Sequence, residues 1–112
     1  MKLNELMLDA GSDIFYDDKF RSTLELFMTH FRNSSGTTVK MVPAIDAYRY
    51  EFDLFSLLSS YNIPPYLHWI IMRMNKMTSP TELSKDVSAL LIPNASIVEQ
   101  IRQAFMSTQR LN

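Results

Sequence analysis

The sequence PPYLHWIIMRMN, at residues 64–75, surrounds one histidine and one arginine with seven apolar residues and anchors the prediction of the fold. Pro64 and Pro65 suit the first turn of a helix, because proline lacks the N–H that would be unpaired there and its φ angle is preset. We predict that Trp69 and one apolar helical face are excluded from water against a preceding helix and a closing strand near Leu90. That face carries Leu67, Ile70, Ile71 and Met74. The outward side should carry Tyr66, Arg73 and Lys76.

Both flanks of this helix carry signals of regular structure. In DLFSLLSSY, residues 53–61, apolar residues recur at helical spacing after Asp53, which can cap the start of a helix. SALLIP, residues 88–93, is a short apolar run closed by a proline and is typical of a buried strand. The centre of the chain therefore predicts two helices followed by a strand.

The end of the chain predicts one more helix. Ser96 and Glu99 have the spacing of a capping box, which favours a helix start at this point. The apolar residues that follow share one face: Ile97, Ile101 and Phe105. Residues 107–112 show no pattern, and we expect a flexible tail there.

The first half of the chain predicts an amphipathic helix and a strand. Asp17 or Asp18 can cap a helix whose apolar stripe is Phe20, Leu24, Phe27 and Phe31. The polar turn NSSG, residues 33–36, ends it. In TTVKMVPAIDAYRYEF, residues 37–52, β-branched and aromatic residues favour extended structure and Pro43 marks a bend. We place the strand around DAYRYEF, residues 46–52.

These elements predict an α+β fold in one domain, because 112 residues are enough for one modest core. A strand-helix-helix-strand core is extended by an amphipathic helix before it and a helix after it. The expected division is an N-terminal arm at 1–18, the amphipathic helix and its turn at 19–36, the core with the C-terminal helix at 37–106, and a tail at 107–112.

Composition narrows the classes of function. The formal net charge is −1, which gives no field to attract nucleic acid or an anionic membrane, so neither is expected as a partner. The chain has no cysteine and only two glycines, which excludes thiolate metal sites and glycine-rich phosphate loops. It has no apolar run of the roughly 20 residues that a membrane span needs. We expect synthesis in the cytoplasm.

Catalytic chemistry has little support in the sequence. The two histidines, His30 and His68, lack a local carboxylate partner and the spacing of a shared metal site, so we assign them structural or surface roles. We expect no enzyme activity, no metal and no cofactor. Trp69 suits either core packing or a ligand platform, and Arg73 could stack over its ring with a free guanidinium, as an interface anchor does.

Residues 48–101, about half of the chain, resemble the LysM-like segment of baseplate wedge proteins from contractile-tailed bacteriophages and related injection machines. The resemblance rests on ordered features: an aromatic strand, DLFSLLSSY as first helix, Trp69 followed by apolar residues and Asn75, Pro80 with Leu83, and LLIP followed by a helix. The family normally carries a glycine in the loop before the last strand, where this chain has Lys85, Asp86 and Val87. The resemblance implies a LysM-like strand-helix-helix-strand core.

The resemblance also implies a function. Baseplate members are structural assembly components, so this chain would be a wedge subunit that binds neighbouring baseplate or tail proteins in the virion. Two alternatives stay open: a glycan-binding LysM-type module, in which Tyr66, Trp69 or Asn75 contacts sugar rings, and a small phage-encoded regulator of a host protein. For an assembly role, the arm at 1–18 would order on binding. The candidate interface residues are Phe15, Tyr16, Tyr66, Trp69, Arg73 and Met77.

Overall fold

The structure is a computed structural model that describes the backbone of residues 13–111 and the side chains of residues 14–107. The chain is α+β. Two short strands, β1 (Thr38–Met41) and β2 (Ala89–Ile92), form an antiparallel sheet in which Val39 is opposite Leu91 and Met41 is opposite Ala89. The segment between the strands forms α4 (Ala44–Arg49), α5 (Leu54–Ser60), η3 (Pro65–Leu67), α6 (His68–Met74) and η4 (Pro80–Glu82).

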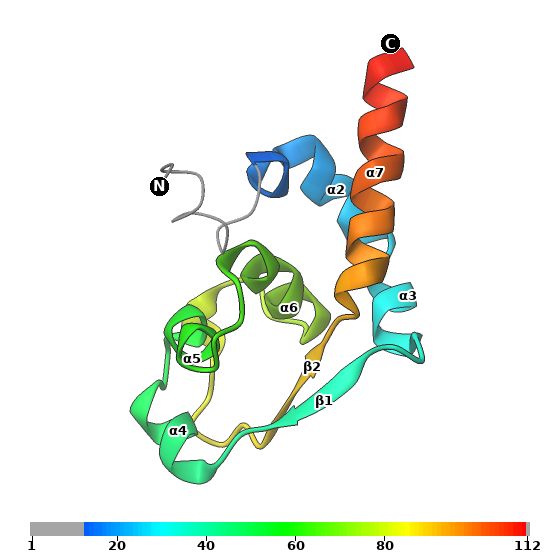
Figure 1. Cartoon of the computed structure of the whole chain (residues 1–112). Coiled ribbons are helices and arrows are strands. Elements are labelled where there is room, and N and C mark those ends of the chain that lie inside the picture. Colours follow the sequence, from blue (N-terminus) through cyan, green and yellow to red (C-terminus); the bar gives the residue numbers. More distant parts are fainter. Residues whose placement is uncertain (1–12, 112) are drawn as a thin grey trace, which may run out of the picture.

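The remaining elements stand at the other end of the molecule from α4 (Figure 1). They are η2 (Asp13–Tyr16), α2 (Asp18–Leu26), α3 (Met28–Asn33) and the long α7 (Ala95–Leu111). Helix α6 lies between the two ends, packed against α3, α5 and β2. It is therefore the centre of the core.

The predicted burial of α6 is confirmed. Its apolar face, Leu67, Ile70, Ile71 and Met74, is buried, and so is the closing residue Leu90. Trp69 is half-buried against the same core. The preceding helix α5 also forms where expected, because the Asp53 carboxylate accepts a hydrogen bond from the Ser56 N–H at 3.3 Å and caps its start.

The first strand is misplaced in the sequence prediction. Residues 46–52 form the end of α4 and a turn, and the strand lies upstream at Thr38–Met41. Pro43 does not bend a strand but precedes α4. Ala47, within that helix, is buried. The Tyr61 hydroxyl donates a hydrogen bond to Asp46 Oδ2 at 2.8 Å. These long-range contacts select a helix where local β propensity favours a strand.

The order strand, two helices, strand is therefore modified. Between β1 and β2 the chain inserts α4 before the two expected helices. The aromatic strand that forms one feature of the LysM resemblance is helical at Tyr48. The features that follow it, α5, α6 and β2, occupy the expected places.

The N-terminal helix is broken at Phe27. Helix α2 ends there and α3 begins at Met28, because Phe27 leaves helical geometry with φ −101° and ψ 4°. The break shifts the register, so Phe27 is 38% exposed and Met28 is buried in its place. The actual buried stripe is Phe20, Leu24, Met28 and Phe31. The predicted cap is confirmed, since Asp17 Oδ1 accepts from the N–H groups of Lys19 and Phe20.

Both predicted ends need correction. Asn94, not Ser96, caps α7, because its Oδ1 accepts the Ser96 N–H at 2.8 Å, while Glu99 pairs with Arg102. Helix α7 continues to Leu111, so helix replaces the expected tail at 107–111.

In the predicted arm, η2 is ordered and Phe15 is only 6% exposed, so this part belongs to the core. Residues 1–12 and 112 lie outside the described part.

Candidate interaction surface

The predicted interface residues gather where η2, α2 and α6 meet. The Arg21 guanidinium carbon lies 5.1 Å from the centroid of the Trp69 ring and 5.5 Å from that of the Tyr16 ring. Arg21 Nε also donates to the Phe15 carbonyl at 3.0 Å. The cation is thus held between two aromatic rings of its own chain, at a spacing typical of cation–π contacts.

Arg73 continues this line of contacts one turn along α6. Its guanidinium pairs with the Glu25 carboxylate on α2, and its Nη1 donates to the Met77 carbonyl at 2.7 Å. The hydrogen bond that Arg73 donates to Glu25 raises the pKa of Arg73. The expectation that Arg73 stacks over Trp69 with a free guanidinium is wrong: Arg21 takes that place. We call the four side chains Arg21, Glu25, Trp69 and Arg73 the α2–α6 seam.

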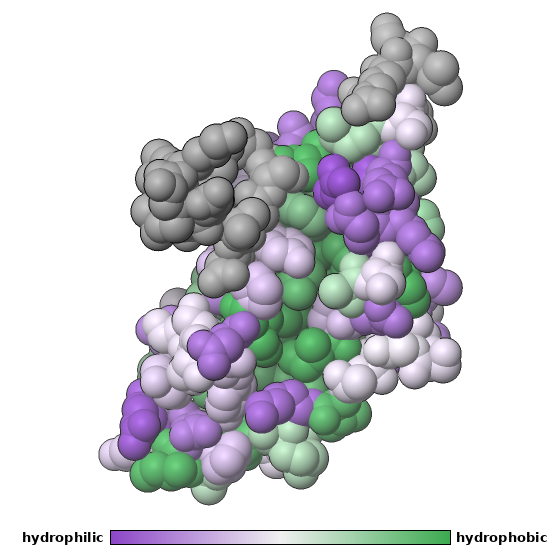
Figure 2. Space-filling view, in the orientation of Figure 1, coloured by the Kyte–Doolittle hydropathy of each residue, from purple (hydrophilic) through white to green (hydrophobic). Residues whose placement is uncertain are grey.

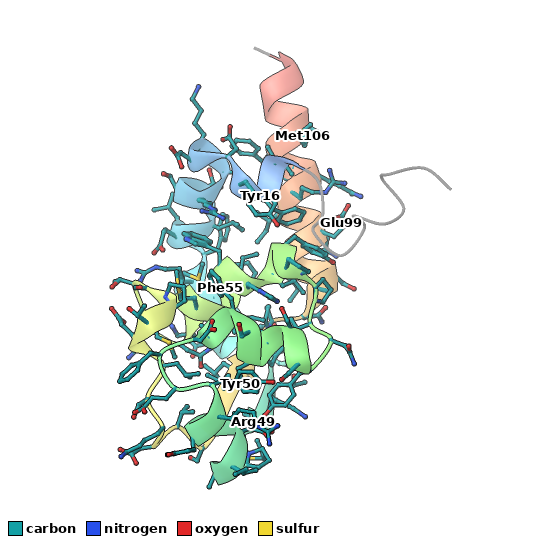
Figure 3. The ribbon with its side chains drawn as sticks, turned by 90° about the vertical axis from the view of Figure 1, so that its left-hand side faces the viewer. Tyr16, Arg49, Tyr50, Phe55, Glu99 and Met106 are labelled. Atoms are coloured by element: carbon teal, nitrogen blue, oxygen red, sulfur yellow. The ribbon has the colours of Figure 1, made fainter. Side chains whose placement is uncertain are left out.

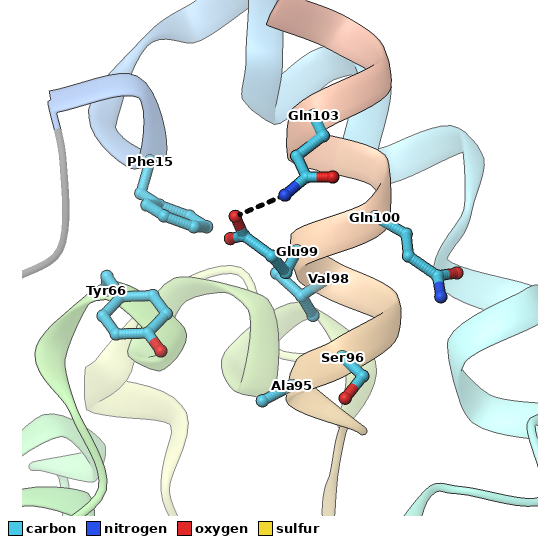
Figure 4. Close-up of a pocket in the computed structure, with 8 residues that line it drawn as sticks. All are labelled: Phe15, Tyr66, Ala95, Ser96, Val98, Glu99, Gln100 and Gln103. Atoms are coloured by element: carbon cyan, nitrogen blue, oxygen red, sulfur yellow. Dashed lines mark hydrogen bonds between the residues drawn. The ribbon is translucent and has the colours of Figure 1, made fainter.

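A hollow of about 410 Å³ lies beside the seam, between η2, η3 and α7. The rings of Phe15 and Tyr66 contact each other at one wall in a tilted arrangement, with centroids 4.7 Å apart. Figure 4 shows the Glu99 carboxylate on the opposite wall, where it accepts from Gln103 Nε2 at 3.3 Å. The hydrogen bond from Arg102 lowers the pKa of Glu99. The hollow therefore contains an ionised group that is already paired.

Most of the predicted interface is consequently used inside the chain. Of the six residues proposed from the sequence, Tyr16 is the exposed one, at 47%. Phe15 is buried, and the rest are partly buried against the core or in ion pairs: Tyr66, Trp69, Arg73 and Met77. These side chains therefore make contacts within the chain, and Trp69 and Arg73 form part of the seam.

Besides Tyr16, Leu26 and Phe27 at the η2–α2 end, the exposed large apolar residues of the described part lie at the end of the molecule formed by β1 and α4. Five large side chains within residues 39–52 are between 59% and 69% exposed: Val39, Met41, Ile45, Tyr48 and Phe52. We call them the β1–α4 surface. Figure 2 shows green apolar residues among purple polar ones at the lower end of the molecule, where Figure 1 places α4 and β1. An exposed group of this kind is informative, because large apolar patches on folded proteins mark interaction sites.

Several contacts hold this surface in place. The Tyr61–Asp46 hydrogen bond ties α4 to the end of α5, and burial together with Asp46 raises the pKa of Tyr61 to about 12. The Lys40 ammonium lies 4.6 Å from the centroid of the Tyr61 ring. The exposed side chains therefore project from elements that are anchored to the core.

Phe52 shows the same anchoring at the backbone. Its φ angle is 67°, which is uncommon for a bulky residue, and its N–H donates to the Leu83 carbonyl at 2.9 Å. The phenyl ring remains exposed. The backbone of Phe52 is therefore bonded to the core while its ring is held in water.

Sequence reasoning missed this surface. Residues 39–52 contain many large apolar side chains, and a strand with one buried face can bury only every second residue. This excess was the sign of an exposed apolar surface. Interpreting the segment as a strand around residues 46–52 assigned alternate residues to the core. The structure instead turns Ala47 inward and leaves its larger neighbours outside.

The two histidines have different surroundings. His68 is buried, with Nε2 donating to the Ile63 carbonyl at 2.8 Å and its ring 5.5 Å from that of Phe55. Burial lowers its pKa. His30 is exposed on α3. Within residues 13–111, no three histidine, aspartate or glutamate side chains are grouped so that they could hold a metal ion.

None of the helices in the described part of the chain has the length and apolar character needed to cross a membrane. Comparisons of the chain with protein-family models, with curated proteins and with solved structures return no match.

Proposed function

We propose that this chain is a non-enzymatic assembly protein that binds neighbouring protein subunits through the β1–α4 surface. One observation carries the proposal: five large apolar side chains are held in water by elements anchored to the core. Side chains of this size and exposure amount to on the order of 600 Å², near the roughly 800 Å² that each partner contributes to a standard interface.

The composition of the surface supports a protein partner. Tyrosine, phenylalanine and methionine are enriched in the centres of protein interfaces, where acidic residues and lysine are depleted. Tyr48 and Phe52 provide rigid aromatic anchors, and Met41 provides a flexible side chain that adapts to a partner's shape.

In its finer form, the proposal is that the assembly is the baseplate of a contractile phage tail, with the chain as a wedge subunit in the virion. The support is the resemblance of residues 53–101, whose features fall on α5, α6, β2 and α7. The aromatic strand no longer contributes to this support, because Tyr48 is helical. The partners would be other baseplate or tail proteins.

The glycan-binding alternative has less support from the geometry. Sugar rings stack on exposed aromatic faces, but the Trp69 ring is covered by the Arg21 guanidinium. The Tyr66 ring packs against Phe15. Asn75 uses its side-chain amide on the backbone of Ile71 and Leu91.

Site-specific photocross-linking tests the proposal. Tyr48 is replaced by benzoylphenylalanine in the cells that naturally make the chain, and the cross-linked products are identified by mass spectrometry. Tyr16 is the matched control, because it is also an exposed tyrosine but stands at the opposite end of the molecule from α4 (Figure 3).

We expect cross-links from position 48 to a structural subunit, and few or none from position 16. A baseplate or tail subunit at position 48 supports the finer proposal, and a subunit of another assembly supports only the coarser one. A host enzyme as the product favours the regulator alternative. Cross-links only from position 16 would show that the wrong surface has been chosen.

A further inference from the structure

We propose that the partner binds as an extended strand that adds to the outer edge of β1 and lays apolar side chains on the β1–α4 surface. This inference rests on the proposed function and specifies the partner's conformation. The occupant is a segment of another protein with β-forming, alternately apolar residues, and the sheet would grow from two strands to three.

The hydrogen-bond pattern of the sheet shows which backbone groups of β1 are open. The Val42 N–H donates to the Ser88 carbonyl at 2.9 Å, so residue 42 faces β2. Successive residues of a strand direct their backbone groups to opposite sides, so Thr38 and Lys40 also face β2. The N–H and C=O groups of Val39 and Met41 therefore point away from the sheet, and all four residues of β1 are exposed.

The opposite edge of the sheet is covered at Leu91 within the chain. Asn75 Oδ1 accepts the Leu91 N–H at 2.9 Å, and Asn75 Nδ2 donates to the Leu91 carbonyl at 3.1 Å. The asparagine side chain thus imitates a neighbouring strand residue. Because exposed edges invite pairing with other chains, proteins commonly cover them. In the described part of the chain, β2 has such a cover at Leu91 and β1 has none.

Lys40 does not protect the open edge. Lysines on edge strands usually block strand addition by placing a charge beside the open backbone groups. Here Lys40 is opposite Leu90, which is buried, so its side chain is on the core side of the sheet. Its ammonium rests on the Tyr61 ring. The outer face of β1 is left with the side chains of Val39 and Met41.

A second copy of this chain is a poorer occupant. A two-fold pairing of β1 with β1, with Val39 bonded to Met41 of the other copy, would place the two Lys40 residues directly opposite each other. Like charges in that position destabilise a sheet. A strand from a different protein avoids this conflict.

Peptide selection and amide exchange test the inference. A display library of random 12-residue linear peptides is panned on the full chain, and the strongest binders are synthesised. Hydrogen exchange of the ¹⁵N-labelled chain is then followed by NMR with and without each peptide. We expect the exchange of the Val39 and Met41 amides to slow at least tenfold. The Lys40 amide already belongs to the β1–β2 ladder and should change little.

A proline substitution separates backbone from side-chain contacts. Met41→Pro removes an outward N–H, which proline tolerates at a sheet edge, so the melting temperature should stay close to that of the wild type. Peptide affinity should fall at least tenfold. The matched control, Met41→Leu, keeps the N–H and a side chain of similar size, and affinity should change less than threefold.

Three outcomes would overturn strand addition. They are a failure to select any binding peptide, peptides that bind Met41→Pro as well as the wild type, and peptides that leave the Val39 and Met41 amides unprotected. The proposed function is judged separately by the position-48 cross-link. A cross-link of equal yield in the Met41→Pro chain would show that the partner binds at the β1–α4 surface but not as an added strand.

Discussion

The α2–α6 seam and the β1–α4 surface both contain aromatic residues, but these residues have different surroundings. In the seam, Trp69 is covered by Arg21, and Arg73 is paired with Glu25, so the aromatic ring and the charges meet partners within the chain. On the β1–α4 surface, Tyr48 and Phe52 have most of their area in water. An aromatic residue is therefore an interface candidate only once its own chain is known to leave it uncovered.

The largest expected effect comes from truncating the aromatic residue of each region. Trp69→Ala should lower the free energy of unfolding by about 2–3 kcal/mol, because it removes a large ring that is half-buried under Arg21. Tyr48→Ala should change it by about 0.5 kcal/mol or less, since that ring is mostly exposed. Urea denaturation of both variants measures the difference. Equal losses would remove the distinction between the two regions.

A smaller effect should follow from opening the covered edge of the sheet. Asn75→Ala leaves the Leu91 N–H and carbonyl without their partners, and we expect a loss of about 1.5–2 kcal/mol in unfolding free energy. Ser22→Ala, at an exposed position of α2, is the control and should be nearly neutral. Amide exchange at Leu91 should rise in the Asn75 variant. An unchanged rate would contradict the role given to Asn75.

The smallest effect concerns the buried residue His68 and depends on pH. Burial lowers the pKa of His68 below its unfolded value of about 6.5, so the unfolded chain binds more protons near that pH. Stability from neutral His68 is thus complete above about pH 6.5 and is lost as the pH falls below it. The urea midpoint should decrease from pH 7.5 to pH 5.0. In the His68→Leu variant, the part of this decrease that comes from His68 should be absent. Identical slopes of the urea midpoint against pH in the variant and the wild type would contradict this role of His68.

The sequence predicts the central elements well because their signals are local. Helical spacing, a capping carboxylate at Asp53 and the proline pair fix α5 and α6, and LLIP marks β2. The first strand could not be placed in this way. Helix α4 depends on the burial of Ala47 and on the Tyr61–Asp46 bond, which joins residues distant in sequence.

The candidate surface could be predicted only in part, for the same reason. The seam has Arg21 and Glu25 as partners for Trp69 and Arg73, and these lie about half the chain away in sequence. No local spacing indicates such a pairing. The one-residue register shift at Phe27 is likewise a consequence of packing, since Met28 and Phe27 both fit an apolar stripe.

The most direct test of the central claim combines stability with binding in one variant. Ile45→Glu/Tyr48→Glu places two charges on the β1–α4 surface without touching the seam. The account predicts an unfolding free energy within about 0.5 kcal/mol per substitution of the wild type. It also predicts that the tagged wild-type chain co-purifies with a structural subunit and that the variant loses it. Retention of that subunit, or a loss of stability above about 3 kcal/mol, would contradict it.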